Sequence, residues 1–69
     1  MRILVVDDEP QIMQLCVKIL SRAGHEVEGV TQGEDALLRL AAGPVDLLVV
    51  DYKMPGLSGF DVIRRARNF

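Results

Sequence analysis

The sequence predicts an α/β protein in which a small parallel sheet is covered on both faces, with strands and helices alternating as βαβαβα. Two continuous apolar runs, Ile3–Val6 and Leu47–Val50, are rich in Val and are typical of strands buried on both faces of a parallel sheet. Segments with helical spacing of apolar residues separate the strand-like runs, as in α/β proteins. Right-handed crossovers then give the strand order 2-1-3.

The first strand is predicted over residues 2–6 and the first helix from Pro10 onward. Proline suits the first helical position because its fixed φ is already helical. Gly24 is a natural left-handed residue at which this helix would end. Apolar residues recur along the helix at helical spacing, namely Ile12, Leu15, Cys16, Ile19, Leu20 and Ala23.

The second strand is predicted over residues 25–30, where the alternation of Glu26 and Glu28 with Val27 suits an exposed edge. The second helix should start at Thr31–Glu34, which has the spacing of a capping box. Gly43 followed by Pro44 should end it, as a glycine stop before a residue that cannot continue a helix. Its predicted apolar face consists of Ala36, Leu37, Leu40 and Ala41.

The third strand is predicted over residues 46–50, and a short third helix should follow Ser58. Ser58 and Asp61 repeat the capping spacing. The residues expected to face inward from this helix are Phe60, Val62, Ile63 and Ala66.

Aspartates follow both apolar runs: Asp7 and Asp8 follow the first, and Asp51 follows the second. If these strands are parallel neighbours, the three carboxylates emerge at one carboxyl edge, where open α/β sheets bind ligands. Such a cluster repels itself and favours a cation, and hard oxygen ligands suit Mg²⁺. The alternative for any one of these aspartates is a local role as a turn former or helix cap.

The residues after Asp51 narrow this interpretation. They read Tyr52-Lys53-Met54-Pro55-Gly56-Leu57-Ser58-Gly59. The pattern Asp-x-x-Met-Pro-Gly-x-x-Gly, preceded by Asp7-Asp8-Glu9 in the expected order and spacing, resembles the receiver domain of two-component response regulators over the whole chain. The resemblance implies a flavodoxin-like, doubly wound fold and a signalling component of a phosphorelay, rather than an enzyme with a separate substrate.

The resemblance also implies residue roles. Asp51 matches the phosphoacceptor, which a sensor histidine kinase phosphorylates with Mg²⁺ as cofactor. Asp8 matches a direct metal ligand, and Asp7 matches a residue that acts through a metal-bound water. Lys53 matches a position whose backbone carbonyl binds the metal. Glu9 completes the acidic triplet without a ligand role.

The same resemblance implies that residues 1–69 are the N-terminal half of one receiver domain, with the fourth and fifth strands absent. Receivers carry a Ser or Thr after the fourth strand and a Lys after the fifth, and both contact the phosphoryl group. We therefore expect phosphorylation of Asp51 to be impaired in this chain. Lys53 could partly replace the missing lysine.

An uncovered third strand, Leu47–Val50, predicts self-association, because unpaired apolar edges template pairing with other chains. The alternative function is thus a half-fold assembly module with a vestigial acidic site. A third possibility is a phosphatase with an aspartate nucleophile. Such enzymes use Asp-x-Asp, and Lys53 occupies the position of the second acid, where it cannot act as a general acid.

Composition bounds the remaining possibilities. A net charge of −2 argues against direct nucleic-acid binding. Cys16 is the single cysteine, so no intramolecular disulfide forms, and the chain fits a reducing, cytoplasmic location. No apolar stretch approaches the roughly 18 residues of a membrane span. Hydrophobic residues make up 49% of only 69, so we expect a marginal core with apolar surface left over.

Overall fold

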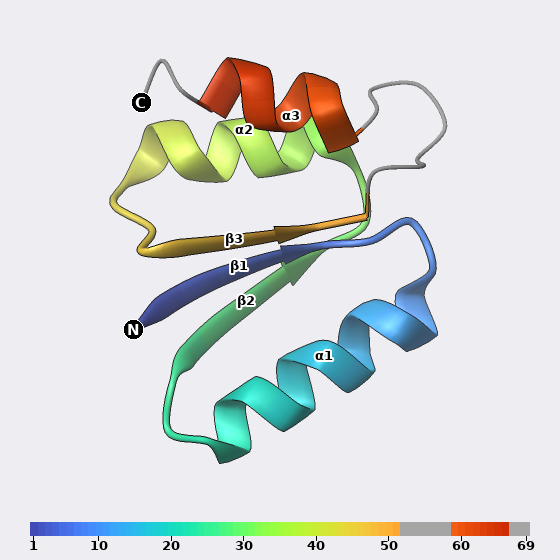
Figure 1. Ribbon diagram of the computed structural model, residues 1–69, viewed down its shortest axis with the longest axis vertical. Helices are drawn as coiled ribbons and strands as arrows, with labels where there is room; N and C mark the ends of the chain where they lie inside the picture. Colours follow the sequence, from blue (N-terminus) through green and yellow to red (C-terminus); the bar gives the residue numbers. More distant parts are fainter. Residues whose placement is uncertain (52–58, 67–69) are drawn as a thin grey trace.

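The computed structural model describes residues 1–51 and 59–66 (Figure 1). The predicted strands and helices form in the predicted order. In chain order they are β1 (Arg2–Val6), α1 (Pro10–Arg22), β2 (Glu26–Val30), α2 (Gly33–Ala42), β3 (Leu47–Val50) and α3 (Gly59–Ala66). In this part of the chain, no helix is long and apolar enough to cross a membrane.

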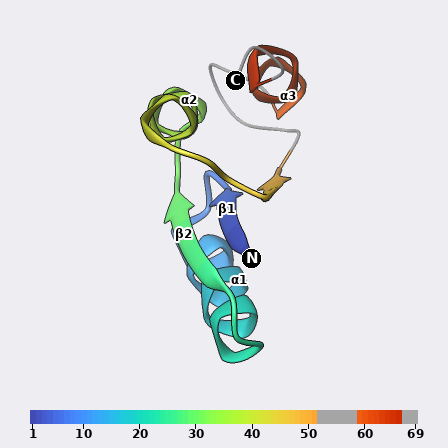
Figure 2. The same ribbon diagram turned by 90° about the vertical axis from the view of Figure 1, so that its left-hand side faces the viewer.

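The strands form one parallel sheet in the order β2-β1-β3, which confirms the predicted topology. Val5 of the central strand lies beside Gly29 of β2 and Val49 of β3, which sets the register. Helix α1 covers one face of the sheet, and α2 and α3 lie together over the other (Figure 2). The sheet is therefore wound on both sides, as the alternating pattern predicts.

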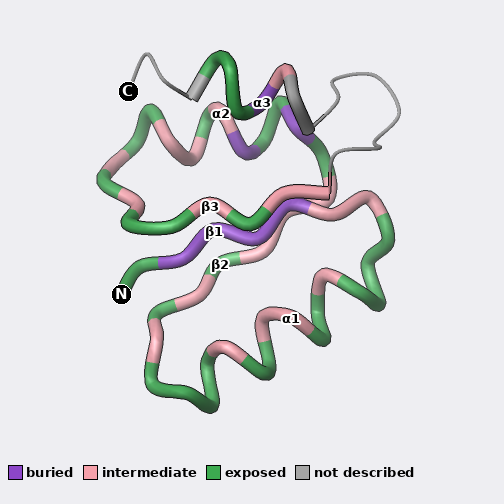
Figure 3. The backbone as a smooth tube through the Cα atoms, in the orientation of Figure 1, coloured by how far each residue is buried: buried purple, intermediate pink, exposed green. Residues whose placement is uncertain are grey.

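The core surrounds β1, the strand with a neighbour on each side. Its four apolar residues, Ile3 to Val6, are each at most 3% exposed (Figure 3). On the α2 and α3 side, the buried residues that pack together are Leu4, Val6, Ala36 and Val62. Burying aliphatic side chains in this way supplies most of the stabilisation of a small α/β unit.

Strand β3 differs from its prediction. Leu48 and Val50 pack on the core beneath α2 and α3, but Leu47 is 42% and Val49 is 37% exposed. Helix α1 packs on β2 and β1, so it leaves the corresponding face of β3 uncovered. The prediction that this run is buried on both faces is therefore wrong, although β1 fulfils it.

Helix α1 also buries less of its apolar stripe than expected. Met13 and Val17 pack closely on β2 at Gly29, where an added Cβ would meet both side chains. The predicted stripe residues Ile12, Leu15 and Ile19 are 43–57% exposed, whereas Cys16 and Leu20 are half-buried. The apolar face of α1 therefore extends beyond the part of the helix that contacts the sheet.

The helix boundaries show which local signals operate. Pro10 is the first residue of α1, and Gly24, with φ of 97°, follows its end in the left-handed conformation, as predicted. Gln32 is the N-cap of α2 and makes no side-chain capping hydrogen bond, so the predicted capping box is wrong. Gly43 has φ of 172°, which is extended rather than left-handed; the following Pro44 favours extended backbone at that residue.

Helix α3 begins at Gly59, close to the predicted start, and Ser58 lies outside the described residues. Val62 is fully buried, as predicted, but Ile63 is 47% exposed and so does not face inward. The predicted inward side chains of Phe60 and Ala66 lie outside the part that is described.

Candidate functional site

The backbone ladder of the sheet continues one residue past β1 and β3, and this places two aspartates at its carboxyl edge. The N–H of Asp7 donates to the carbonyl of Val30 at the end of β2, at 3.2 Å. The N–H of Asp51 donates to the carbonyl of Val6 at the end of β1, at 2.9 Å. Both residues are thus held by parallel-sheet bonding, which positions side chains better than a free loop does.

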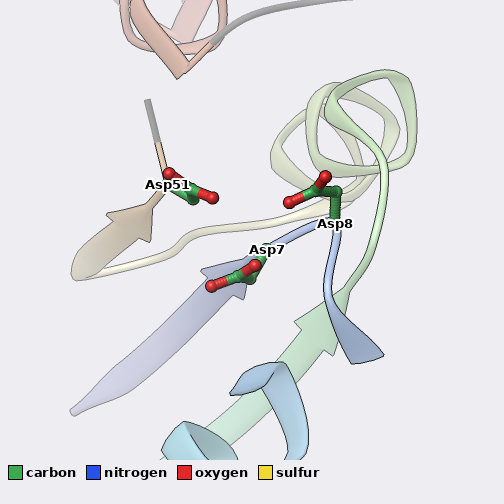
Figure 4. A group of neighbouring side chains, drawn as sticks. All are labelled: Asp7, Asp8 and Asp51. Carbon is green, nitrogen blue, oxygen red and sulfur yellow. The ribbon is translucent and has the colours of Figure 1, made fainter. Parts of the chain in front are cut away.

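The side chains of Asp7, Asp8 and Asp51 come together at this edge (Figure 4). Each offers one carboxylate oxygen, and these oxygens all lie within 4.8 Å of one another. The carboxylates of Asp8 and Asp51 point toward each other beyond the end of β1 (Figure 4). All three residues are half-buried. The fold thus brings together two segments that are far apart in the sequence to form the acidic cluster.

The donor set fits a small divalent cation. Three carboxylates supply only hard oxygen ligands, which Mg²⁺ prefers over nitrogen or sulfur. Because the groups are partly shielded from solvent, salt screens their mutual repulsion less than it screens fully exposed charges. Mg²⁺ usually takes one or two protein carboxylates and keeps several waters, so this cluster supplies enough protein ligands.

Asp7 has a second contact that sequence reasoning missed. Its Oδ1 accepts a hydrogen bond from the N–H of Glu9 at 3.0 Å. Glu9 is the N-cap of α1, and its own side chain makes no capping bond. An aspartate that accepts from the N–H two residues ahead is an Asx turn, and an Asp two residues before a helix N-cap is the signal that could have found it.

The remaining predicted site residue, Lys53, lies outside the described residues, as does the Met54-Pro55-Gly56 turn. The backbone-carbonyl role of Lys53 and its possible contact with a phosphoryl group stay predictions. Asp51 is placed by its backbone contact with β1 and by its position in the cluster.

A pocket of about 300 Å³ lies elsewhere, beside the amino-terminal halves of β1 and β2. Its charged lining residues already form ion pairs, Arg2 with Glu26 at 3.2 Å and Arg39 with Glu28 at 2.9 Å. Open α/β sheets bind ligands at the opposite, carboxyl edge. The acidic cluster, and not this pocket, is therefore the candidate site.

Comparison with known proteins gives a family for this arrangement. A family model described as the response regulator receiver domain matches residues 3–69. The transcriptional regulatory protein TcrA of Mycobacterium tuberculosis is 41% identical over 66 residues, which are 96% of this chain and 26% of TcrA. The chain therefore spans about a quarter of the length of that curated relative.

Solved structures agree in fold. The chemotaxis protein CheY4 of Vibrio cholerae superposes with a TM-score of 0.94 at 33% identity, covering 97% of this chain and 56% of that chain. The response regulator TrrA of Thermotoga maritima, solved in complex with Mg²⁺ and BeF, gives 0.91 at 43% identity, covering 97% of this chain and 58% of that one. TrrA was also solved in complex with the histidine kinase ThkA.

Proposed function

Because this chain belongs to the response regulator receiver family, we propose that Asp51 accepts a phosphoryl group with Mg²⁺ held by the neighbouring carboxylates. The observation that carries the proposal is the gathering of Asp7, Asp8 and Asp51 within 4.8 Å at the carboxyl edge of a parallel sheet. Receiver domains are signalling modules, and the proposed activity is acceptance of a signal rather than turnover of a separate substrate.

In the proposed step, a carboxylate oxygen of Asp51 forms a bond to phosphorus. The bond from phosphorus to the donor nitrogen, a phosphohistidine, breaks, and its electron pair leaves with that nitrogen. The product is an acyl phosphate on Asp51. The strand end and the backbone bond to Val6 hold the nucleophile in position, which supplies the orientation that phosphoryl transfer requires.

Asp8 is proposed as a direct metal ligand and Asp7 as a ligand of a metal-bound water, with the backbone carbonyl of Lys53 completing the protein set. When bound, the metal neutralises charge on the attacking carboxylate and on the phosphoryl oxygens. The structural support is the half-buried, all-oxygen donor set described above.

The proposed donor is a sensor histidine kinase, supported by the complex of TrrA with ThkA. The chain covers 56–58% of the matched receiver chains CheY4 and TrrA, and we propose that on its own it is phosphorylated slowly. A cytoplasmic location stays a prediction.

The Lys53→Ala variant tests whether this lysine assists phosphorylation of Asp51. An undiminished rate of phosphorylation in this variant would remove Lys53 from the proposal.

The test is phosphorylation by a small acyl phosphate in the presence of Mg²⁺, followed by intact mass and by Mg²⁺-dependent binding of beryllofluoride. We expect one phosphoryl group on the wild type and none on Asp51→Asn. Asp46→Asn is the matched control, because Asp46 flanks the opposite end of β3 and the charge change is identical. Equal phosphorylation of Asp51→Asn, or no Mg²⁺-dependent binding by the wild type, would overturn the proposal.

A second candidate function is self-association through β3, favoured by the exposed Leu47 and Val49 on its uncovered face. In the described part of the chain, β3 pairs with β1 alone. Oligomers that form without regard to metal, in a chain that does not accept phosphate, would favour an assembly module over a receiver.

A further inference from the structure

We infer that Asp7 is a positioning residue, whose Oδ1 fixes the loop that carries Asp8 while its charge serves the metal site. The inference rests on the proposed function and assigns two separable duties to one side chain. The first role is to accept a hydrogen bond within the loop, which needs an oxygen atom but no charge. The second role is electrostatic attraction of the cation, which needs the charge.

The loop is held at Asp7 from both sides. The backbone N–H of Asp7 donates to Val30 of β2 at 3.2 Å, and its side chain accepts from the N–H of Glu9 at 3.0 Å. Asp7 thereby ties the end of β1 to β2 and to the start of α1. Asp8 lies between the two tied residues, so its backbone has little freedom to change direction.

The helix start adds the second constraint. The carbonyl of Glu9 accepts the N–H of Met13 at 3.0 Å, the first hydrogen bond of α1. Pro10 has no N–H to offer, and Glu9 makes no side-chain capping bond. The Asx turn at Asp7 therefore connects this helix start to the end of β1, and it helps to set where the carboxylate of Asp8 emerges.

The two duties can be separated because an amide keeps an acceptor oxygen and loses the charge. Asp7→Asn retains the turn, whereas Asp7→Ala removes both turn and charge. Residues that orient metal ligands typically change metal affinity by about 10- to 100-fold. We expect Asp7→Asn to weaken Mg²⁺ binding by about 10-fold, and Asp7→Ala to weaken it by nearer 100-fold.

The experiment combines Mg²⁺ titration by calorimetry with amide hydrogen exchange at Glu9 in the metal-free protein. Protection of the Glu9 N–H should persist in Asp7→Asn and vanish in Asp7→Ala. Asp7→Ser should partly restore both readouts, because a hydroxyl forms the same turn more weakly. Asp35→Asn and Asp35→Ala are matched controls, since Asp35 is an exposed acid in the first turn of α2, and neither should change binding.

Equal losses of Mg²⁺ affinity in Asp7→Asn and Asp7→Ala, with unchanged exchange at Glu9, would overturn the positioning role. Exchange at Glu9 is compared with that of the rest of α1, so a global loss of stability in the alanine variant is recognised separately. A wild type that binds no Mg²⁺ would overturn the proposed metal site. Hydrogen exchange at the Glu9 N–H would then still show whether the Asp7 side chain forms the Asx turn.

Discussion

Asp8 and Glu9 are sequence neighbours with the same charge, yet the fold gives them different surroundings. Asp8 is half-buried in the acidic cluster, whereas Glu9 is exposed and serves as the N-cap of α1. A carboxylate contributes to a metal site only where the backbone turns it toward the other ligands. Identical chemistry at adjacent positions therefore leads to different expected roles.

This difference predicts how metal affects stability. A ligand that binds only the folded state stabilises it by mass action, by about 2.7 kcal/mol at 100 times its Kd. We expect Mg²⁺ to raise the melting temperature of the wild type and of Glu9→Gln, and a chelator to reverse the rise. Asp8→Asn should lose most of it. Circular dichroism melts at matched ionic strength measure this, and a loss in Glu9→Gln as large as in Asp8→Asn would contradict the assignment.

At the scale of elements, two glycines allow α1 and β2 to form as they do, for different reasons. Gly29 lies in β2 beneath α1, where an added Cβ would collide with the sulfur of Met13 and come within 2.8 Å of Val17. Gly24, between α1 and β2, has open space around it but a φ of 97°. One glycine is thus required by packing and the other by backbone conformation.

Alanine substitutions should separate these causes. Gly29→Ala should lower the free energy of unfolding by about 1–3 kcal/mol through overpacking. Gly24→Ala should cost about 1–2 kcal/mol through left-handed strain, and Gly24→Asn should cost less. Gly43→Ala is the control, because the backbone of Gly43 is extended and an added Cβ would lie 3.7 Å from its nearest contact, the Arg39 side chain, which is an ordinary van der Waals distance. Urea unfolding measures all of them, and a neutral Gly29→Ala would show that the Met13 and Val17 side chains or the helix move aside at little cost.

For the whole molecule, the decisive feature is that the two faces of the sheet are covered unequally. Helices α2 and α3 pack over one face, but on the other α1 covers β2 and β1 and leaves β3 bare. Apolar residues exposed on this side are Ile12, Leu15, Ile19, Leu47 and Val49. Exposed apolar surface of this kind can mark a site of protein–protein interaction.

Self-association is the corresponding prediction. Light scattering coupled to size exclusion should give a particle larger than one chain, and Leu47→Lys or Val49→Lys should shift it toward the monomer. Leu38→Lys is the control, because Leu38 is 70% exposed on α2, which lies over the face of the sheet opposite to α1. A folded, monodisperse wild-type monomer would refute the proposed association, and an equal effect of Leu38→Lys would show only a general gain in solubility.

Local sequence was sufficient for the elements, their order and the position of each aspartate after its strand. Apolar runs, helical spacing, Pro10 and Gly24 act over a few residues, and parallel crossovers then leave one topology. The motif Asp7-Asp8-Glu9 and the motif that begins at Asp51 together indicated the family for the same reason, since each is a contiguous pattern. The gathering of Asp7, Asp8 and Asp51 followed from that topology.

Burial and the backbone contact of Asp7 with β2 depended on the tertiary structure. Apolar character shows which side chains could be buried, but Leu47 and Ile12 are exposed because no described element packs over them. The predicted capping box at Thr31 did not form. The N-cap of α2 is Gln32 instead, and it makes no side-chain capping hydrogen bond. The Asx turn at Asp7 is a local contact with a signal in the sequence, whereas the bond from the Asp7 N–H to Val30 formed because β2 lies beside β1. Periodicity shows which side chains could be buried, and the elements packed around each side chain decide whether it is buried.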